Sequence, residues 1–361
     1  MDQSQYIFLI YSLFFLGTTA FSLLTNSILL RFTRTMGTKN QRGAKAIRWS
    51  SESKPAIGGI TFFMVFLISF VCYSIFFFPE EVFKNTQLLG LLLTALLAFL
   101  MGLADDAYNT RPLLKFAVQV SCGIILILTG THIELFEWAY LNYALTIFWT
   151  IGMMNSINML DNMDAITSVV SIFILLSTLL TIYVMGELGT AEFMIVLGVV
   201  ASLTGFLFFN WNPSKMYMGD TGSQFLGLFL AFIGIRYCWN APSLSGELLV
   251  SRQISITLLV YLLPIIDTTI VVINRIRRGQ SPFVGGRDHT THVLSYQGLS
   301  DSQVAMTFGG IGALSLLTTI FFQKYVETWT WWHAGGVLAY FVLLLSVMFY
   351  LAKINKANYI N

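Results

Sequence analysis

Two adjacent aspartates, Asp105 and Asp106, end an apolar run and are followed by Arg111, Pro112 and Lys115. Carboxylates at the end of a membrane-spanning stretch are costly unless they are hydrated, paired with a cation or bound to a metal. Neighbouring positions on a helix do not share a face, so we expect the two aspartates to play different parts. One could meet a cation while the other reaches a substrate or Lys115. The alternative is a helix end followed by a solvated turn.

A second polar string carries an amide or acid at every third position where another apolar run ends. Its members are Asn155, Asn158, Asp161 and Asp164. Residues three apart on a helix are neighbours, so consecutive members would form a polar ridge. Such a ridge can hold a nucleotide or hydrated Mg²⁺ through hard oxygen ligands. Capping of the helix end by Asn and Asp explains the string equally well.

A third string extends over residues 209–223 and contains Asn210, Tyr217 and Asp220. Its proline and glycines indicate a structured loop before the next apolar run. A helix N-terminus has free N–H groups and the positive end of a dipole, which suit a phosphate or a metal–phosphate complex. Tyr217 offers a flat face on which a base could stack. The alternative is a capped helix with an aromatic side chain at the lipid interface.

A fourth string combines arginines and histidines in one loop: Arg275, Arg287, His289 and His292. The planar guanidinium group suits diphosphate oxygens, although the arginines are also explained as topology signals. The histidines could donate to phosphate or act as acid or base near neutral pH. A zinc site is not indicated, because no third ligand follows at the usual spacing. Asp267, inside the preceding apolar run, is either functional or half of a buried pair.

These strings lie at the ends of apolar runs in a chain of 361 residues that is 56% hydrophobic and 11% charged. Soluble domains carry about 25% charged residues, so the composition excludes an ordinary soluble globule and a disordered chain. A helix needs about 20 apolar residues to cross a bilayer, so we predict an all-α integral membrane protein with about 11 transmembrane helices. No linker divides the chain, and residues 1–361 are predicted to form a single polytopic catalytic domain.

The apolar runs lie at approximately residues 6–30, 57–78, 86–104, 113–130, 141–158, 165–186, 191–209, 222–239, 254–274, 305–322 and 332–352. With the N-terminus outside, every Lys and Arg falls on the inner side except Lys84, Arg236, Arg252 and Lys324. The positive-inside rule therefore predicts an outer N-terminus and a cytosolic C-terminus. The acidic strings fall on the same inner side, so we expect cytosolic loops to build the active site. The net charge is +2, and we expect no nucleic-acid partner.

Taken in order, the strings resemble those of the polyprenyl-phosphate N-acetylhexosamine-1-phosphate transferase family, of the glycosyltransferase 4 type. They are most similar to the undecaprenyl-phosphate GlcNAc-1-phosphate transferases that initiate O-antigen and teichoic acid synthesis. The string Lys54-Pro55-Ala56-Ile57-Gly58-Gly59 also matches, so the resemblance covers most of the chain.

The resemblance implies that a polyprenyl (undecaprenyl) phosphate attacks the β-phosphate of a UDP-N-acetylhexosamine. The products would be polyprenyl-diphospho-HexNAc and UMP, with GlcNAc as the expected sugar. It also implies a requirement for Mg²⁺, with Mn²⁺ as an alternative. The expected location is the bacterial inner (cytoplasmic) membrane, with the lipid bilayer as partner. The oligomeric state is left undecided, with a homodimer as one alternative.

The resemblance also implies roles for individual residues. Asp220 would be the Mg²⁺ ligand. Asp105 and Asp106 would handle the lipid phosphate, by proton removal or through the metal, and Asp161 and Asp164 would lie beside the nucleotide–metal site. The residues expected to bind substrate are Asn155, Asn158, Asn210, Tyr217, Lys115, Arg275, Arg287, His289 and His292. Within that set, Tyr217 would stack on uracil and the histidines and arginines would hold the diphosphate or sugar.

Three positions depart from the family's pattern. Asn162 and Ala165 replace the glycines of its Asp-Gly-x-Asp-Gly string, which puts close backbone approach to the nucleotide in doubt. Thr291 replaces the middle member of the three-histidine pattern of many relatives. The three adjacent histidines of the phospho-muramoyl-pentapeptide transferases are missing, which argues against that alternative. A secondary transporter, the alternative of another class, would have polar residues near the midplane and a repeat between halves.

Overall fold

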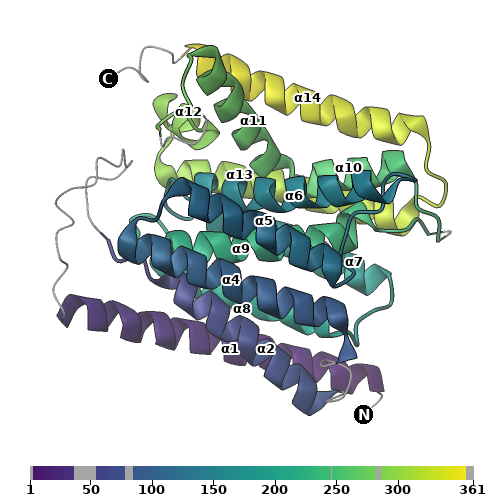
Figure 1. Ribbon diagram of the computed structural model, residues 1–361, viewed down its shortest axis with the longest axis horizontal. Helices are drawn as coiled ribbons and strands as arrows, with labels where there is room; N and C mark the ends of the chain where they lie inside the picture. Colours follow the sequence, from purple (N-terminus) through teal and green to yellow (C-terminus); the bar gives the residue numbers. More distant parts are fainter. Residues whose placement is uncertain (1–2, 36–53, 78–83, 245, 282–285, 355–361) are drawn as a thin grey trace.

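The computed structural model describes residues 3–35, 54–77, 84–244, 246–281 and 286–354 (Figure 1). One helix occupies each of the predicted apolar runs except the run at 254–274, which is broken into two helices, and this confirms the all-α class. The helices are α1 (Gln3–Thr35), α2 (Gly58–Phe76), α4 (Thr86–Tyr108), α5 (Pro112–Leu128), α6 (Ala139–Leu160), α7 (Ile166–Val184), α8 (Ala191–Asn210), α9 (Gly219–Gly234) with the π-helix η1 (Ile235–Trp239), α10 (Val250–Val260), α11 (Leu262–Arg277), the short α12 (Thr290–Tyr296), α13 (Asp301–Tyr325) and α14 (Trp331–Ile354).

The described residues contain 7 helices that are long and apolar enough to cross a membrane, namely α1, α2, α4, α7, α8, α13 and α14. The pair α10 and α11, bent by 82° at one break, raises the number to at most 8. This confirms a multi-pass membrane protein. Crossing by α5, α6 and α9, on which the predicted total of about eleven depends, stays a prediction, as does the orientation. Figure 1 shows α1 beginning and α14 ending at opposite ends of the bundle.

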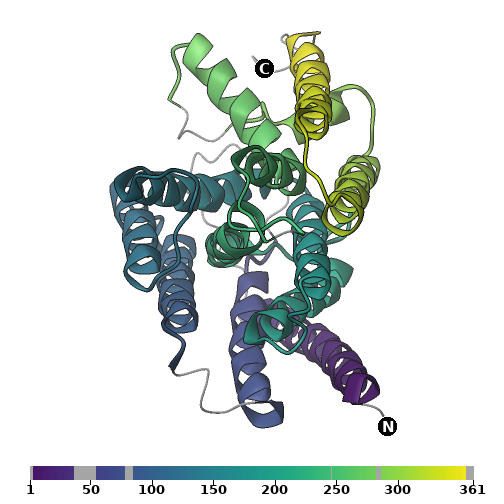
Figure 2. The same ribbon diagram turned by 90° about the vertical axis from the view of Figure 1, so that its right-hand side faces the viewer.

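The helix α9 forms the centre of the bundle, and every residue from Thr221 to Gly234 is buried. Helices α2, α4 and α6 pack around α9. In the view turned by 90°, most helices are seen roughly end-on and lie side by side (Figure 2). Glycines allow the closest approaches: a Cβ on Gly59 of α2 would lie 2.7 Å from the Thr221 carbonyl carbon, and one on Gly102 of α4 would lie 2.6 Å from its Cα. Small residues are the usual means by which membrane helices bring their backbones together.

The connection between α4 and α5 is tight because its residue types match the required conformations. Asn109, with φ of 50°, ends α4 in the left-handed conformation, which asparagine tolerates better than most residues. Pro112 then opens α5, where its fixed φ is favourable and its missing N–H is not needed. The reversal brings the first turn of α5, with Lys115, beside the last turn of α4, with Asp105.

Candidate active site

Asp105 and Asp106 take different partners, as their adjacent helix positions predict. One Asp105 oxygen accepts from the Thr110 backbone N–H at 2.9 Å and from its hydroxyl at 2.6 Å. The other lies 2.9 Å from the Lys115 ammonium nitrogen. Asp105 is therefore held in place by the α4–α5 connection, with its charge balanced by the lysine.

Asp106 instead caps α9, a helix far away in the sequence. Its carboxylate accepts from the backbone N–H groups of Asp220 at 3.0 Å and Thr221 at 2.8 Å, and from the Thr221 hydroxyl at 2.6 Å. A helix N-terminus lacks internal partners for its first N–H groups, and a carboxylate is well suited to satisfy them. Asp106 thus anchors the turn that carries Asp220.

Asp220 lies where three of the polar strings meet. Its carboxylate is 3.6 Å from the Lys115 ammonium nitrogen and accepts a hydrogen bond from the Asn158 amide. Asn158 also donates to the Ser223 hydroxyl at 2.8 Å, one turn further along α9. Lys115 therefore lies between two carboxylates from different helices, and the predicted cluster around Asp220 forms in the structure.

Asp161 adds a further carboxylate immediately after α6 ends at Leu160. Burial, reinforced by the nearby Asp220 and Asp106 carboxylates, raises the pKa of Asp161 to about 8. Each carboxylate disfavours ionisation of the next, because Coulomb repulsion is weakly screened away from bulk water. The site thus concentrates more negative charge than Lys115 alone balances.

This donor set fits a divalent cation such as Mg²⁺. The described residues contain no group of three or more His, Cys, Asp or Glu side chains arranged to hold a metal ion by themselves. Mg²⁺, however, is usually bound by one or two carboxylates, with water and substrate phosphates as its other ligands. Asp220 and Asp161 supply the hard oxygen atoms, and a cation would relieve the repulsion that, after burial, raises the pKa of Asp161.

Asp164 and Asn210 hold the loop before α9 rather than facing an open site. Asp164 accepts from the Ser214 N–H at 2.9 Å, from its hydroxyl at 2.7 Å and from the Asn212 amide at 3.0 Å. Asn210, 2% exposed, accepts from Ala165 N at 3.2 Å and donates to the Met216 carbonyl at 3.1 Å. Both residues thus secure the loop, and the roles expected of them beside the nucleotide stay predictions.

Tyr217 is presented by pairing of its loop with the segment that precedes α2. Its backbone N–H donates to the Pro55 carbonyl at 2.9 Å, and its carbonyl accepts from Ile57 and Gly58 at 3.2 and 3.1 Å. The ring is half-buried, with the Lys54 ammonium nitrogen 5.5 Å from its centroid. A ring supported in this way has the flat surface that stacking on a base requires, so its predicted role remains open to test.

The histidine string is held by a buried ion pair and by a buried hydrogen bond between a histidine and a carboxylate. Arg275 lies 2.7 Å from Asp288, with Arg278 on the same carboxylate, and His289 Nδ1 lies 2.9 Å from Asp267 Oδ2. Although burial opposes ionisation, the bond from Arg275 keeps the pKa of Asp288 below its usual range. Arg275 is therefore engaged within the protein, which differs from the diphosphate contact expected of it.

The remaining members of this string differ in exposure. Arg287 is exposed, whereas His292 is 2% exposed and burial, together with the nearby His289, lowers its pKa to about 3. His292 is thus neutral at physiological pH, and the acid–base role considered for it does not fit its environment. Thr291 joins the string to the α6–α7 loop, since its hydroxyl donates to Asn162 Oδ1 at 2.6 Å.

Two buried glutamines, not predicted from the sequence, extend the site into the bundle. Asn155 donates to Gln119 Oε1 at 2.8 Å, and Gln119 donates to Gln224 Oε1 at 3.1 Å. Gln119 and Gln224 are 1% and 0% exposed. Asn155 is therefore part of an amide chain between α5, α6 and α9. A lone glutamine within an apolar run is the signal that could have indicated this chain.

Ala165 is in a conformation that alanine rarely adopts. It precedes α7 with φ of 68°, at one of the positions where the family pattern has glycine. A left-handed conformation costs an L-residue about 1–2 kcal/mol, and glycine avoids this cost. Part of the gain is lost, because glycine has more conformational freedom in the unfolded chain. We expect Ala165→Gly to raise the free energy of unfolding by about 0.5–1 kcal/mol, measured by thermal unfolding in detergent. Ala313→Gly, inside right-handed α13, should lower it by a similar amount; equal losses in both would contradict the interpretation.

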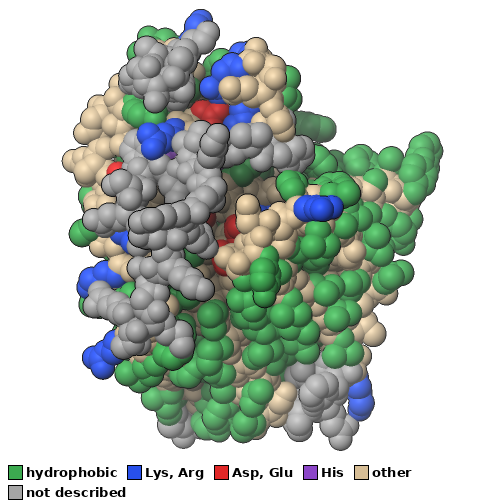
Figure 3. All heavy atoms as spheres, turned by 60° about the vertical axis from the view of Figure 1, so that its left-hand side comes forward, with side chains coloured by type: hydrophobic (Ala, Val, Ile, Leu, Met, Phe, Trp, Pro, Cys, Tyr) green, Lys and Arg blue, Asp and Glu red, His purple; other side chains and the backbone are tan. Residues whose placement is uncertain are grey.

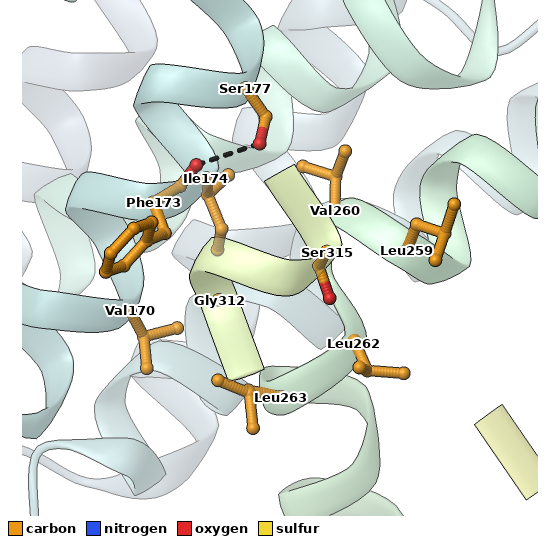
Figure 4. A pocket seen from close by; sticks show the side chains of 10 residues that line it. All are labelled: Val170, Phe173, Ile174, Ser177, Leu259, Val260, Leu262, Leu263, Gly312 and Ser315. Carbon is orange, nitrogen blue, oxygen red and sulfur yellow. Dashed lines mark hydrogen bonds between the residues drawn. The ribbon is translucent and has the colours of Figure 1, made fainter. Parts of the chain in front are cut away.

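The pocket in Figure 4 is separate from this cluster. It lies between α7, α10, α11 and α13, is lined by apolar residues and two serines, and has a volume of about 10 Å³. That volume suits about one water molecule, so the pocket cannot take a nucleotide sugar. Figure 3 instead shows acidic side chains near the middle of one end of the molecule, with basic side chains around them and a broad hydrophobic surface below.

Fold and site together define a helical integral membrane protein with a carboxylate-rich site at one end of its bundle. Residues 88–238 match the model of glycosyl transferase family 4, a region that contains the first three strings. The chain is 27% identical over 306 residues to a probable undecaprenyl-phosphate N-acetylglucosaminyl 1-phosphate transferase of Bacillus subtilis, covering 82% of this chain and 78% of that protein. It is 28% identical to a phospho-N-acetylmuramoyl-pentapeptide-transferase of Listeria innocua, covering 74% and 83%. The chain is therefore similar to these transferases, as its motifs predict.

Proposed function

We propose that the protein transfers N-acetylglucosamine 1-phosphate from UDP-GlcNAc to undecaprenyl phosphate in the bacterial inner membrane. The observation that carries the proposal is the meeting of Asp105 and Asp220 at Lys115, with the Asp161 carboxylate close enough to Asp220 to be repelled by it, at one end of a membrane bundle. The reaction forms a bond between a lipid-phosphate oxygen and the β-phosphorus of the donor and breaks the bond from that phosphorus to the bridging oxygen. UMP leaves, and polyprenyl-diphospho-GlcNAc remains in the membrane as the first lipid-linked unit of a surface glycan.

The residues of this site position charge rather than form covalent bonds in this proposal. Lys115, held by Asp105, can meet a phosphate oxygen, and Asp106 keeps the turn with Asp220 in register. Mg²⁺, held by Asp220 and Asp161, would supply neutralisation of the charge shared by the two phosphates. Tyr217 and the loop secured by Asp164 and Asn210 would receive the nucleotide. Phosphoryl transfer depends mainly on such alignment and charge neutralisation.

Two observations favour GlcNAc over the muramoyl-pentapeptide donor. The Bacillus subtilis relative covers more of this chain than the Listeria innocua relative does, and the run of three adjacent histidines is missing around His289. Transport is disfavoured because the carboxylates are gathered at one end of the bundle, whereas transporter sites lie near the midplane.

Membranes that contain the protein and undecaprenyl phosphate should release UMP from UDP-GlcNAc. We expect chelation of divalent cations to abolish release and added Mg²⁺ to restore it, because the carboxylate cluster repels phosphates without a cation. The measurement is UMP formation with a panel of donors: UDP-GlcNAc, UDP-GalNAc and UDP-MurNAc-pentapeptide. Release from the pentapeptide donor alone would favour the alternative, and release from none would refute the transferase assignment.

A further inference from the structure

A contact between Asn162 and Thr291 joins the loop after α6, which carries Asp161, to the segment that carries the histidines. The Thr291 hydroxyl donates to Asn162 Oδ1 at 2.6 Å, and Asn162 Nδ2 donates to the Met159 carbonyl at 2.8 Å in the last turn of α6. Both atoms of the Asn162 amide are thus engaged, which fixes its orientation. We call Asn162 and Thr291 the clasp.

The clasp connects segments that carry different parts of the site. Asn162 directly follows Asp161, whereas Thr291 lies one residue before His292 and two after His289. On the histidine side, Asp267 Oδ1 accepts from the Thr290 N–H at 2.8 Å and from its hydroxyl at 2.7 Å. His289 and Thr290 therefore tie this segment to α11, and Thr291 ties it to the α6–α7 loop.

The Thr291 hydroxyl depends on this contact. Thr291 is 0% exposed, and a buried hydroxyl needs its partner, because an unpaired one keeps its full desolvation cost.

We propose that the clasp is a positioning pair that sets the affinity for the UDP-sugar donor by holding the histidine segment against the aspartate loop. The inference rests on the proposed function and adds to it that the donor lies between the aspartate loop and the histidine segment. A site already assembled before binding does not need to be ordered by the ligand, which improves affinity without changing the chemical step. The pair acts on KM for the donor and leaves kcat nearly unchanged.

Thr291→Val and Asn162→Ala test the proposal, since valine keeps the shape of threonine and both changes remove the bond. Each is expected to raise KM for UDP-GlcNAc about fivefold, the value of one net hydrogen bond, with kcat within about twofold. Because both changes remove the same hydrogen bond, the KM of the double variant should be no higher than that of the poorer single variant. Thr291→Ser keeps the hydroxyl and should restore KM to within about twofold of the wild type. Thr318→Val is the matched control, as its hydroxyl donates to the Leu314 carbonyl of its own helix.

The outcomes separate this proposal from the proposed function. If the wild type releases UMP but the single variants keep its KM, or their effects multiply in the double variant, the clasp has no such role. A Thr291→Ser variant as impaired as Thr291→Val would also overturn it. If the wild type releases no UMP from any donor, the proposed function fails. Thermal unfolding of the wild type, Thr291→Val, Asn162→Ala and Thr291→Ser, with and without UDP-GlcNAc, then decides the clasp. A shift in the unfolding midpoint on ligand addition that Thr291→Val and Asn162→Ala diminish and Thr291→Ser restores supports the clasp, and an equal shift in these four proteins overturns it.

Discussion

Asp220→Asn should abolish UMP release, with a loss of at least about a thousandfold, while the protein remains folded. The substitution keeps the size of the side chain and its contact with Asn158 but removes the charge at the centre of the carboxylate cluster. Loss of one preorganised electrostatic group commonly reduces kcat by this amount. The measurement is UMP formation at saturating donor, together with thermal unfolding of the purified protein.

Asp106→Asn should differ from Asp220→Asn in a way that the helix cap predicts. Asparagine has one acceptor oxygen, whereas Asp106 receives bonds from two backbone N–H groups and the Thr221 hydroxyl. We expect activity to be lost and the free energy of unfolding to fall by about 1–2 kcal/mol. Glu137→Gln, on an exposed residue in the loop before α6, is the matched control for both changes. Full activity in Asp220→Asn would show that the site is assigned wrongly.

Gly102→Ala should disrupt both the fold and the activity, although it adds only one methyl group and changes no predicted site residue. A Cβ at this position would lie 2.6 Å from the Thr221 Cα, which is backbone and cannot swing away. Helices α4 and α9 must therefore separate, which moves Asp105 and Asp106 relative to Asp220. We expect a loss of about 1–3 kcal/mol in unfolding free energy and of about a hundredfold in UMP release, since shifts near 1 Å are enough for that.

Gly152→Ala provides the comparison for this change. Gly152 lies within α6, and a Cβ there would meet nothing within 4 Å. Alanine is the better helix former, so this variant should keep its activity and gain slightly in stability. Similar behaviour of the two variants would contradict the close approach of α4 to α9. Unfolding midpoints and UMP release, measured on the same preparations, distinguish the outcomes.

The sequence alone was sufficient to predict the helices, the membrane class and the polar strings at the helix ends. Helix position follows from the length of each apolar run relative to the thickness of a bilayer, which is a property of local composition. The different partners of Asp105 and Asp106 were likewise predictable, because adjacent helix positions face different directions. The motifs around Asp161 and Asp220 also indicated the family.

The partner of each side chain was decided only by packing. The resemblance implied that Asp106 handles the lipid phosphate, and the structure shows that it caps a helix that begins more than a hundred residues later. Arg275 looked like a diphosphate ligand, yet it pairs with Asp288, and Asp164 secures the loop before α9. These contacts join segments that are distant in the chain, and periodicity carries no information about which helix ends will meet. The close approaches at Gly59 and Gly102 bring those ends together, and a hydrogen bond then selects its partner within a few tenths of an ångström.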